Sequence, residues 1–99
     1  MSLMDIALRT GVPLVDIEEL VRGNAQVRVA ERFGVPLLAL EEFIRHGQAS
    51  SKMAQRLGMS MAAAEELARS LGPEGAIGLV LGLLLGSGGF ERKNAAASG

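Results

Sequence analysis

A threefold internal repeat constrains this chain more than any other feature of its sequence. The copies align on Gly11, Gly34 and Gly58, which lie 23 and 24 residues apart. An alanine stands four residues before each of these glycines, an arginine stands two before it, and a pair of glutamates begins seven residues after it. Agreement at so many offsets indicates that one supersecondary unit is used three times.

Each copy has the pattern of two short helices joined at its glycine. Glycine readily takes the left-handed conformation that ends a helix, and the proline or serine two residues later suits the start of the next one. Beyond the first glycine, Leu14, Ile17 and Leu20 recur at helical spacing and form one apolar stripe. The sequence therefore predicts an all-α fold of tandem helix-turn-helix hairpins, with about six short helices.

Local capping signals set the expected helix bounds. Ser2 and Asp5 have the spacing of a capping box, Asn24 is expected to cap the third helix, and Ser60 the sixth. The expected helices cover residues 3–10, 13–22, 25–33, 36–46, a fifth that ends at residue 57, and 61–71. We expect one three-repeat domain over residues 1–71, with repeats 2–23, 24–47 and 50–71.

The composition changes at residues 72–74, where a proline and a glutamate favour the start of a seventh helix. Residues 76–86 are apolar all round, and glycines recur at every fourth position, so that they would line one helical face. We predict an apolar helix over residues 73–88 and a disordered tail over residues 89–99. The glycines of this face are Gly78, Gly82 and Gly86.

This apolar helix has three interpretations. A dozen residues span roughly 18–21 Å, which is less than the ~30 Å hydrocarbon core of a membrane, although Arg92 and Lys93 would suit a cytoplasmic flank. The helix would otherwise lie in the core beneath the repeats, or form an oligomer seam in which the glycines, Leu79 and Leu83 meet another chain. Each glycine costs about 0.8–1 kcal/mol relative to alanine, so we expect something to pack against them.

Opposite charges segregate on alternating helices of the repeats. The first helices of the second and third repeats are basic, whereas the second helices of all three are acidic. Such segregation suits stacking of one repeat on the next, inside a chain or between chains, and heterologous stacking closes a ring or continues as a filament. The hypothesised charge-complementary faces are formed by Arg28, Arg32, Lys52 and Arg56 and by Glu18, Glu19, Glu41, Glu42, Glu65 and Glu66.

The middle repeat resembles the helix-turn-helix motif of the repressor and Cro type. It has Ala30 in the first helix, Gly34 in the turn, Val35 directly after it, and Leu40 and Phe43 six and nine residues after the glycine. The other two repeats fit the same pattern over residues 6–22 and 53–69. The resemblance implies that the second helix of each hairpin would enter the major groove of DNA.

The residues at the corresponding reading positions depart from that family. The first turns of the second helices hold apolar residues such as Val15 and Leu38, which cannot bond to base edges beyond a thymine methyl group. The paired glutamates farther along would face phosphates, and a net charge of −1 removes the attraction that drives non-specific binding to nucleic acid. The resemblance therefore supports the hairpin fold more than DNA binding.

No pattern in the sequence suggests catalysis. His46 is the only histidine and falls at an expected helix end, where a capping or surface role is usual. The chain has no cysteine, which excludes disulfides, thiolate zinc sites and thiol catalysis, and it has no phosphate loop or metal-ligand spacing. We expect no catalytic, cofactor-binding or metal-binding residues, and a cytoplasmic location.

These observations favour a non-enzymatic protein-protein interaction module that self-assembles through the apolar C-terminal helix, with a second copy or another protein as partner. The alternative is a small helix-turn-helix DNA-binding transcriptional regulator, which would dimerise through that helix and place Arg28, Arg32, Lys52 and Arg56 on phosphates. A third interpretation is a membrane-associated adaptor.

Overall fold

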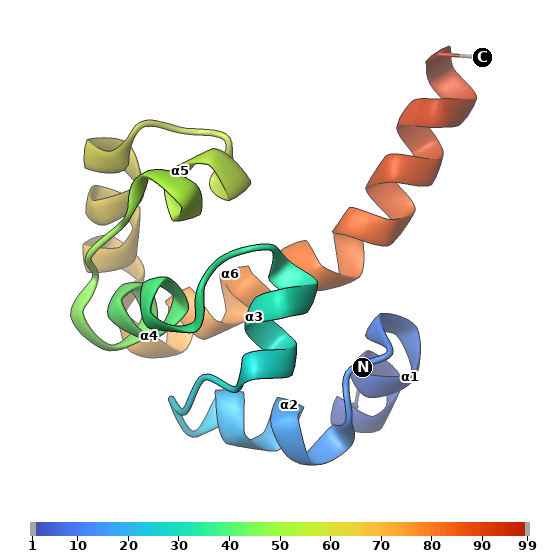
Figure 1. Cartoon of the computed structure of the whole chain (residues 1–99), viewed down its shortest axis with the longest axis horizontal. Helices are drawn as coiled ribbons and strands as arrows, with labels where there is room; N and C mark the ends of the chain where they lie inside the picture. Colours follow the sequence, from blue (N-terminus) through green and yellow to red (C-terminus); the bar gives the residue numbers. More distant parts are fainter. Residues whose placement is uncertain (1, 99) are drawn as a thin grey trace.

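The computed structural model describes the backbone of residues 2–98 and the side chains of residues 2–86. The described backbone is helical and contains no strand, which confirms the all-α fold. Short turns join the helices, and the last helix is much longer than the others (Figure 1). The helices are α1 (Leu3–Thr10), α2 (Leu14–Val21), α3 (Val27–Phe33), α4 (Leu37–His46), α5 (Ser51–Leu57) and α6 (Met61–Ser98).

The three predicted hairpins are present as α1 with α2, α3 with α4, and α5 with the first part of α6. The first helix of each hairpin ends at a left-handed glycine, Gly11, Gly34 or Gly58, with φ between 74° and 89°. The N–H of each glycine donates to the carbonyl of the alanine four residues earlier. The repeated Ala-to-Gly spacing thus produces the same helix ending three times.

Equivalent positions of the three repeats are buried together in one core. This holds for the alanines four residues before each glycine and for the apolar residues six after it. Helices α1 to α5 are only seven to ten residues long, and helices of this length have little stability in isolation. Packing of their buried faces against one another therefore provides most of their stability. The residues concerned are Ala7, Ala30 and Ala54, and Ile17, Leu40 and Ala64.

A kink at Gly72 divides α6 into two parts. Gly72 has φ 74° and ψ 176°, which is not helical, and Pro73 begins the second part. The predicted break between a sixth and a seventh helix therefore lies at this glycine. The helix is assigned as far as Ser98, beyond the predicted end at residue 88. The side chains from residue 87 onward, which include the predicted tail at 89–99, lie outside the described residues.

The second part of α6 crosses the stack of repeats and completes its core. The side chains of Ala76, Ile77, Val80 and Leu84 are buried and belong to the same cluster as the repeat residues. The helix as a whole contacts all five preceding helices, and in Figure 1 its second part starts beneath α4, passes α3 and continues to the upper right. One face of this helix therefore lies in the core beneath the repeats, as one of its three interpretations expected.

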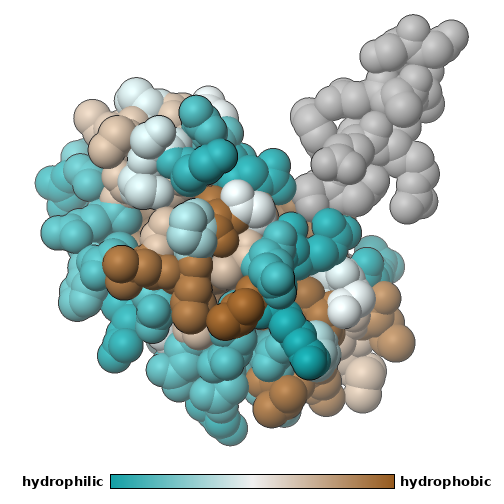
Figure 2. Space-filling model, in the orientation of Figure 1, coloured by the Kyte–Doolittle hydropathy of each residue, from teal (hydrophilic) through white to brown (hydrophobic). Residues whose placement is uncertain are grey.

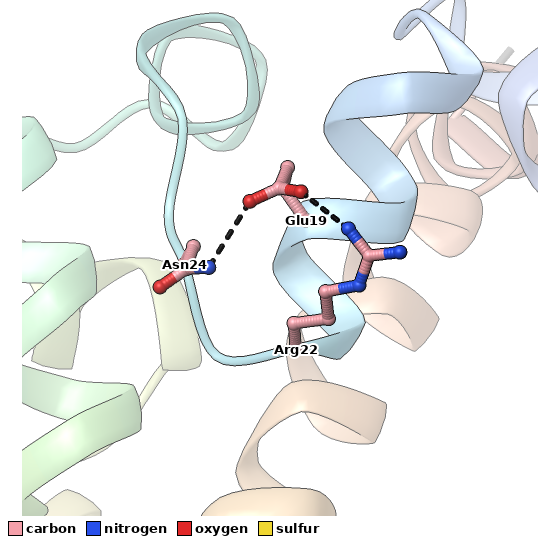
Figure 3. A network of polar contacts seen from close by, with 3 residues as sticks. All are labelled: Glu19, Arg22 and Asn24. Atoms are coloured by element: carbon pink, nitrogen blue, oxygen red, sulfur yellow. Dashed lines mark hydrogen bonds and ion pairs between the residues drawn. The ribbon is translucent and has the colours of Figure 1, made fainter.

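Helix α3 begins later than predicted, and Asn24 does not cap it. The N-cap is Gln26, whose side chain makes no capping bond. Figure 3 shows Asn24 turned back towards α2, where its Nδ2 donates to Glu19 Oε1 at 3.0 Å, while Arg22 Nη1 donates to Glu19 Oε2 at 2.7 Å. Glu19 thus holds both residues of the turn, which draws Asn24 onto the end of α2 and away from α3.

Candidate interaction surfaces

The three glycines of the apolar helix lie on a face that nothing in the described part of the chain covers. Gly78, Gly82 and Gly86 are exposed, and a Cβ atom built at any of them would meet no atom within 4 Å. The flanking side chains of Leu79 and Leu83 are half-buried. The glycines therefore make no close helix contact within the described part of the chain, although close contact is the usual reason for such a spacing.

The opposite face of the same helix is core. Val80 lies two residues from both Gly78 and Gly82, which is about 200° around a helix of 3.6 residues per turn, and it is fully buried. Leu84 stands in the same relation to Gly82 and Gly86 and is also buried. The helix is thus held in place by one face while it presents the other, apolar and free of large side chains, to solvent.

Arginines join each repeat to the one before it. Arg32 Nε donates to the carbonyl oxygen of Thr10 at 3.0 Å, and Arg56 Nε donates to the carbonyl oxygen of Phe33 at 2.5 Å. Both arginines stand two residues before a turn glycine, and both carbonyls stand one residue before the glycine of the preceding repeat. A charged donor from one repeat therefore caps the C-terminal end of the first helix of its neighbour.

These contacts give the basic residues a different role from the one predicted. Within the described side chains, Arg32 and Arg56 bond to carbonyl oxygens, and the one ion pair joins Arg22 to Glu19 inside the first hairpin. The other two basic residues of the hypothesised faces, Arg28 and Lys52, are exposed. The repeats therefore stack inside the chain through arginine and backbone.

The six glutamates of the hypothesised acidic faces differ in their exposure to solvent. Glu18 and Glu66 are exposed, whereas the other four are half-buried. Two of the half-buried carboxylates have structural partners: Glu19 holds the α2–α3 turn, and Glu65 Oε2 accepts from the N–H of Ala49 at 3.1 Å. Glu19 and Glu65 therefore stabilise the loops before α3 and α5 through hydrogen bonds. Glu41 and Glu42 are the other half-buried glutamates.

The first turns of the second helices are apolar and open to solvent. Val15 is 60% exposed and Leu38 is 67% exposed, and both stand four residues after a turn glycine. Figure 2 shows apolar residues reaching the surface over the start of α4 and over α1. Beside Leu38 lies an open groove of about 570 Å³, with Lys52, Glu42 and Glu65 among its lining residues. An apolar surface with charged edges is typical of protein contacts.

His46 and the long apolar stretch that ends at Gly86 belong to different helices, α4 and α6. His46 is exposed in the last turn of α4, next to a left-handed Gly47, and the described residues include no group of acids, histidines or cysteines placed to bind a metal ion. The 26-residue stretch Met61–Gly86 is long and apolar enough to cross a membrane by length and composition, since it contains an 18-residue window with a mean hydropathy of 1.3. That stretch contains the kink at Gly72.

The arginine contacts between repeats are the functional feature that reasoning from sequence missed. The signal was present, because an arginine recurs two residues before every turn glycine, as Arg9, Arg32 and Arg56. The charge pattern assigned Arg32 and Arg56 to contacts with the acidic helices, because such a pattern does not include backbone carbonyls. A comparison of the chain with known protein families, curated proteins and solved structures finds no match.

Proposed function

We propose that this chain is a non-enzymatic protein-protein interaction module that self-assembles, with the glycine face of α6 as a seam between two copies. The observation that carries the proposal is the uncovered row of Gly78, Gly82 and Gly86 on a helix whose opposite face is buried. Alanine at these positions would fit the monomer and would favour the helix by about 1 kcal/mol each. Close approach of a second helix explains why glycine stands there instead.

The geometry of the seam suits two copies of the same helix. Leu79 and Leu83 flank the glycines and are half-buried, so a partner helix lying on the glycine backbone would cover them further. A pairing of identical faces about a twofold axis is isologous, and it closes at a dimer. The glycine seam by itself therefore predicts dimers.

The test compares the mass in solution of the unaltered chain with that of Gly82→Leu, over a range of concentrations, by sedimentation velocity. Because position 82 is exposed and a Cβ atom there would meet no described atom within 4 Å, the variant is expected to fold normally while its leucine holds the second helix away. Ser70→Leu, which adds a leucine at an exposed position on the first part of α6, is the matched control. An unaltered chain that stays a monomer, or a Gly82→Leu variant that assembles as well as the control, would contradict the proposal.

Removal of the apolar segment is a less informative test than this substitution. A chain ending at Leu71 would lack Ala76, Ile77, Val80 and Leu84, which fill the core beneath the repeats. Loss of assembly in such a fragment would follow from unfolding as readily as from loss of the seam. The single substitution separates the two effects.

A DNA-binding regulator is the second proposal, and the exposure of Arg28 and Lys52 favours it. Both stand six residues before a turn glycine, so they occupy equivalent places on α3 and α5 where phosphates would reach them. Fluorescence anisotropy with a labelled duplex at low salt tests this proposal. Affinity that falls steeply with salt and is lost in the Arg28→Ala, Lys52→Ala double variant would support it.

A membrane-associated adaptor is the third proposal, and it rests on the hydropathy of Met61–Gly86. The kink at Gly72 means that the stretch does not form one straight span, so association would use the apolar part after the kink. Co-sedimentation with phospholipid vesicles distinguishes this proposal from the seam. Vesicle binding that Gly82→Leu leaves unchanged, in a chain that is a monomer without lipid, would favour the membrane.

A further inference from the structure

The two internal junctions of the repeat stack follow one rule. The arginine two residues before the glycine of one repeat donates to the carbonyl one residue before the glycine of the preceding repeat. Arg32 does so to Thr10, and Arg56 does so to Phe33. In both cases the acceptor is a backbone carbonyl, so this hydrogen bond does not require a particular side chain at the acceptor position.

The two ends of the stack each hold one half of this junction. At the first end, Arg9 occupies the place of Arg32 and Arg56, and it is exposed with no described hydrogen bond or ion pair. At the other end, the carbonyl of Leu57 occupies the place of the Thr10 and Phe33 carbonyls, and no hydrogen bond to it is described. The adjoining Gly58 is exposed, and a Cβ built there would meet no atom within 4 Å.

We propose that copies of this chain stack head to tail, with Arg9 of one chain donating to the Leu57 carbonyl of the next. The proposal rests on the self-assembly proposed above and names a second contact for it, separate from the glycine seam. Its occupant is a second copy of this chain, because the Leu57 carbonyl at one end lacks a described donor and Arg9 at the other end has no described acceptor. The contact would continue the interface that already joins the repeats inside the chain.

The side chains around the two ends agree with such a contact. Leu8 is 76% exposed beside Arg9, and Met61 is exposed at the other end near Gly58, so both ends present apolar area to cover. Position 2 offers a further comparison, because Ser2 is exposed while its equivalents Ala25 and Ala49 are buried. The first repeat thus shows at its surface a position that the other two repeats bury.

The positive charge at the junction is no obstacle. Arg56 already bonds to the carbonyl directly after Arg32, so the internal junction places two arginines along neighbouring helix ends. Arg9 of a second chain, bonded to the Leu57 carbonyl directly after Arg56, would have the same position relative to Arg56 that Arg56 has relative to Arg32. A contact of this heterologous kind does not close on itself at two copies, and it extends into a ring or a filament.

The experiment measures the mass of five full-length chains by sedimentation velocity over the same concentrations: the unaltered chain, Arg9→Ala, Gly82→Leu, the Arg9→Ala, Gly82→Leu double variant, and Arg45→Ala. Arg45 is exposed in the last turn of α4 with no described hydrogen bond or ion pair, so Arg45→Ala is the control for the loss of one positive charge. Circular dichroism checks that each variant keeps its helices. Loss of a charge-assisted hydrogen bond weakens an association by about tenfold to a hundredfold.

The head-to-tail contact predicts that the unaltered chain and Arg45→Ala form species larger than a dimer, while Arg9→Ala stops at the dimer of the glycine seam. Gly82→Leu is expected to keep an association that further substitution of Arg9 removes. If Arg9→Ala matches Arg45→Ala while Gly82→Leu reduces the mass, the head-to-tail contact is wrong and the seam stands. A chain that is a monomer throughout overturns both.

A crosslinking measurement tests the same contact by position. The chain has no cysteine, so single cysteines can be introduced without background. Leu8→Cys and Gln55→Cys chains, both altered at exposed positions near the two ends, are mixed and treated with a short bismaleimide. A crosslinked pair of the two chains is expected, in greater yield than from Leu8→Cys with Arg45→Cys. Equal yields from the two mixtures would contradict the contact.

Discussion

Arg56 holds Phe33 through two contacts at once. Its Nε donates to the Phe33 carbonyl oxygen at 2.5 Å, and its guanidinium carbon lies 5.3 Å from the centre of the Phe33 ring. The hydrogen bond caps the end of α3, and the position over the ring adds a cation–π attraction. One side chain therefore joins the third repeat to the second through both the backbone and the core aromatic residue.

Replacement of this arginine is expected to lower the stability of the whole stack. Arg56→Ala should reduce the free energy of unfolding by about 1–3 kcal/mol, because a charged hydrogen bond and a cation–π contact are lost together. Arg32→Ala should cost less, since Thr10 offers its arginine a carbonyl but no ring. Urea denaturation followed by circular dichroism, at a concentration too low for assembly, measures both.

Two variants serve as controls for the Arg56 prediction. Arg45→Ala removes an exposed arginine that has no described hydrogen bond or ion pair, and it should change stability by less than about 0.5 kcal/mol. Arg56→Lys keeps the charge but loses the planar group that bonds and stacks, so it should recover only part of the loss. Equal stabilities of Arg56→Ala and Arg45→Ala would show that the contact does not stabilise the chain.

The kink of α6 is expected to require glycine at position 72. With φ 74° and ψ 176°, Gly72 adopts a conformation that is strongly unfavourable for any residue with a Cβ atom, at a cost of about 1–3 kcal/mol. Gly72→Ala should therefore lower the free energy of unfolding by that amount. Thermal or urea denaturation of dilute protein measures the change.

Gly78→Ala is the matched control for the kink. It makes the same chemical change in a helical position where a Cβ meets nothing, so it should raise the free energy of unfolding by about 0.5–1 kcal/mol. The two substitutions thus have opposite expected signs. A Gly72→Ala variant as stable as Gly78→Ala would mean that α6 continues straight without penalty.

The second part of α6 is expected to contribute to the core as strongly as the repeats do. Leu84 is 1% exposed, and Leu84→Ala should lower the free energy of unfolding by about 2–5 kcal/mol, because it removes buried apolar area and leaves a cavity. Leu71→Ala, at a leucine that is 43% exposed, should cost much less. Denaturant titration compares the free energies of unfolding of the two variants. A Leu84→Ala variant that loses no more stability than Leu71→Ala would show that this part of α6 does not contribute to the core.

The position of one glycine face illustrates how far sequence reasoning reached for the candidate site. The spacing of Gly78, Gly82 and Gly86 indicated a smooth helical face, and the sequence left open whether that face would be core, seam or lipid-facing. In the structure the two sides of the helix differ: Val80 and Leu84 on one side belong to the core, while the glycines on the other side stay uncovered. Helical periodicity identified the face, and only packing decided which side the repeats would cover.

The sequence by itself determined the helices of this protein and most of their ends. The capping box of Ser2 and Asp5, the left-handed glycines after α1, α3 and α5, and the break at Gly72 act within a turn or two of the chain. Such signals depend on local backbone geometry and on bonds between near neighbours. They can therefore be read from consecutive residues.

The tertiary structure alone decided how the repeats hold one another. Arg32 meets Thr10 across 22 residues of sequence and Arg56 meets Phe33 across 23, and in both cases the acceptor is a backbone carbonyl that every residue carries. Asn24 shows the same limit on a smaller scale, because its partner Glu19 drew it away from the helix that it was expected to cap. Which of many identical acceptors a donor reaches depends on where packing places the two helices, and a linear pattern does not contain that distance.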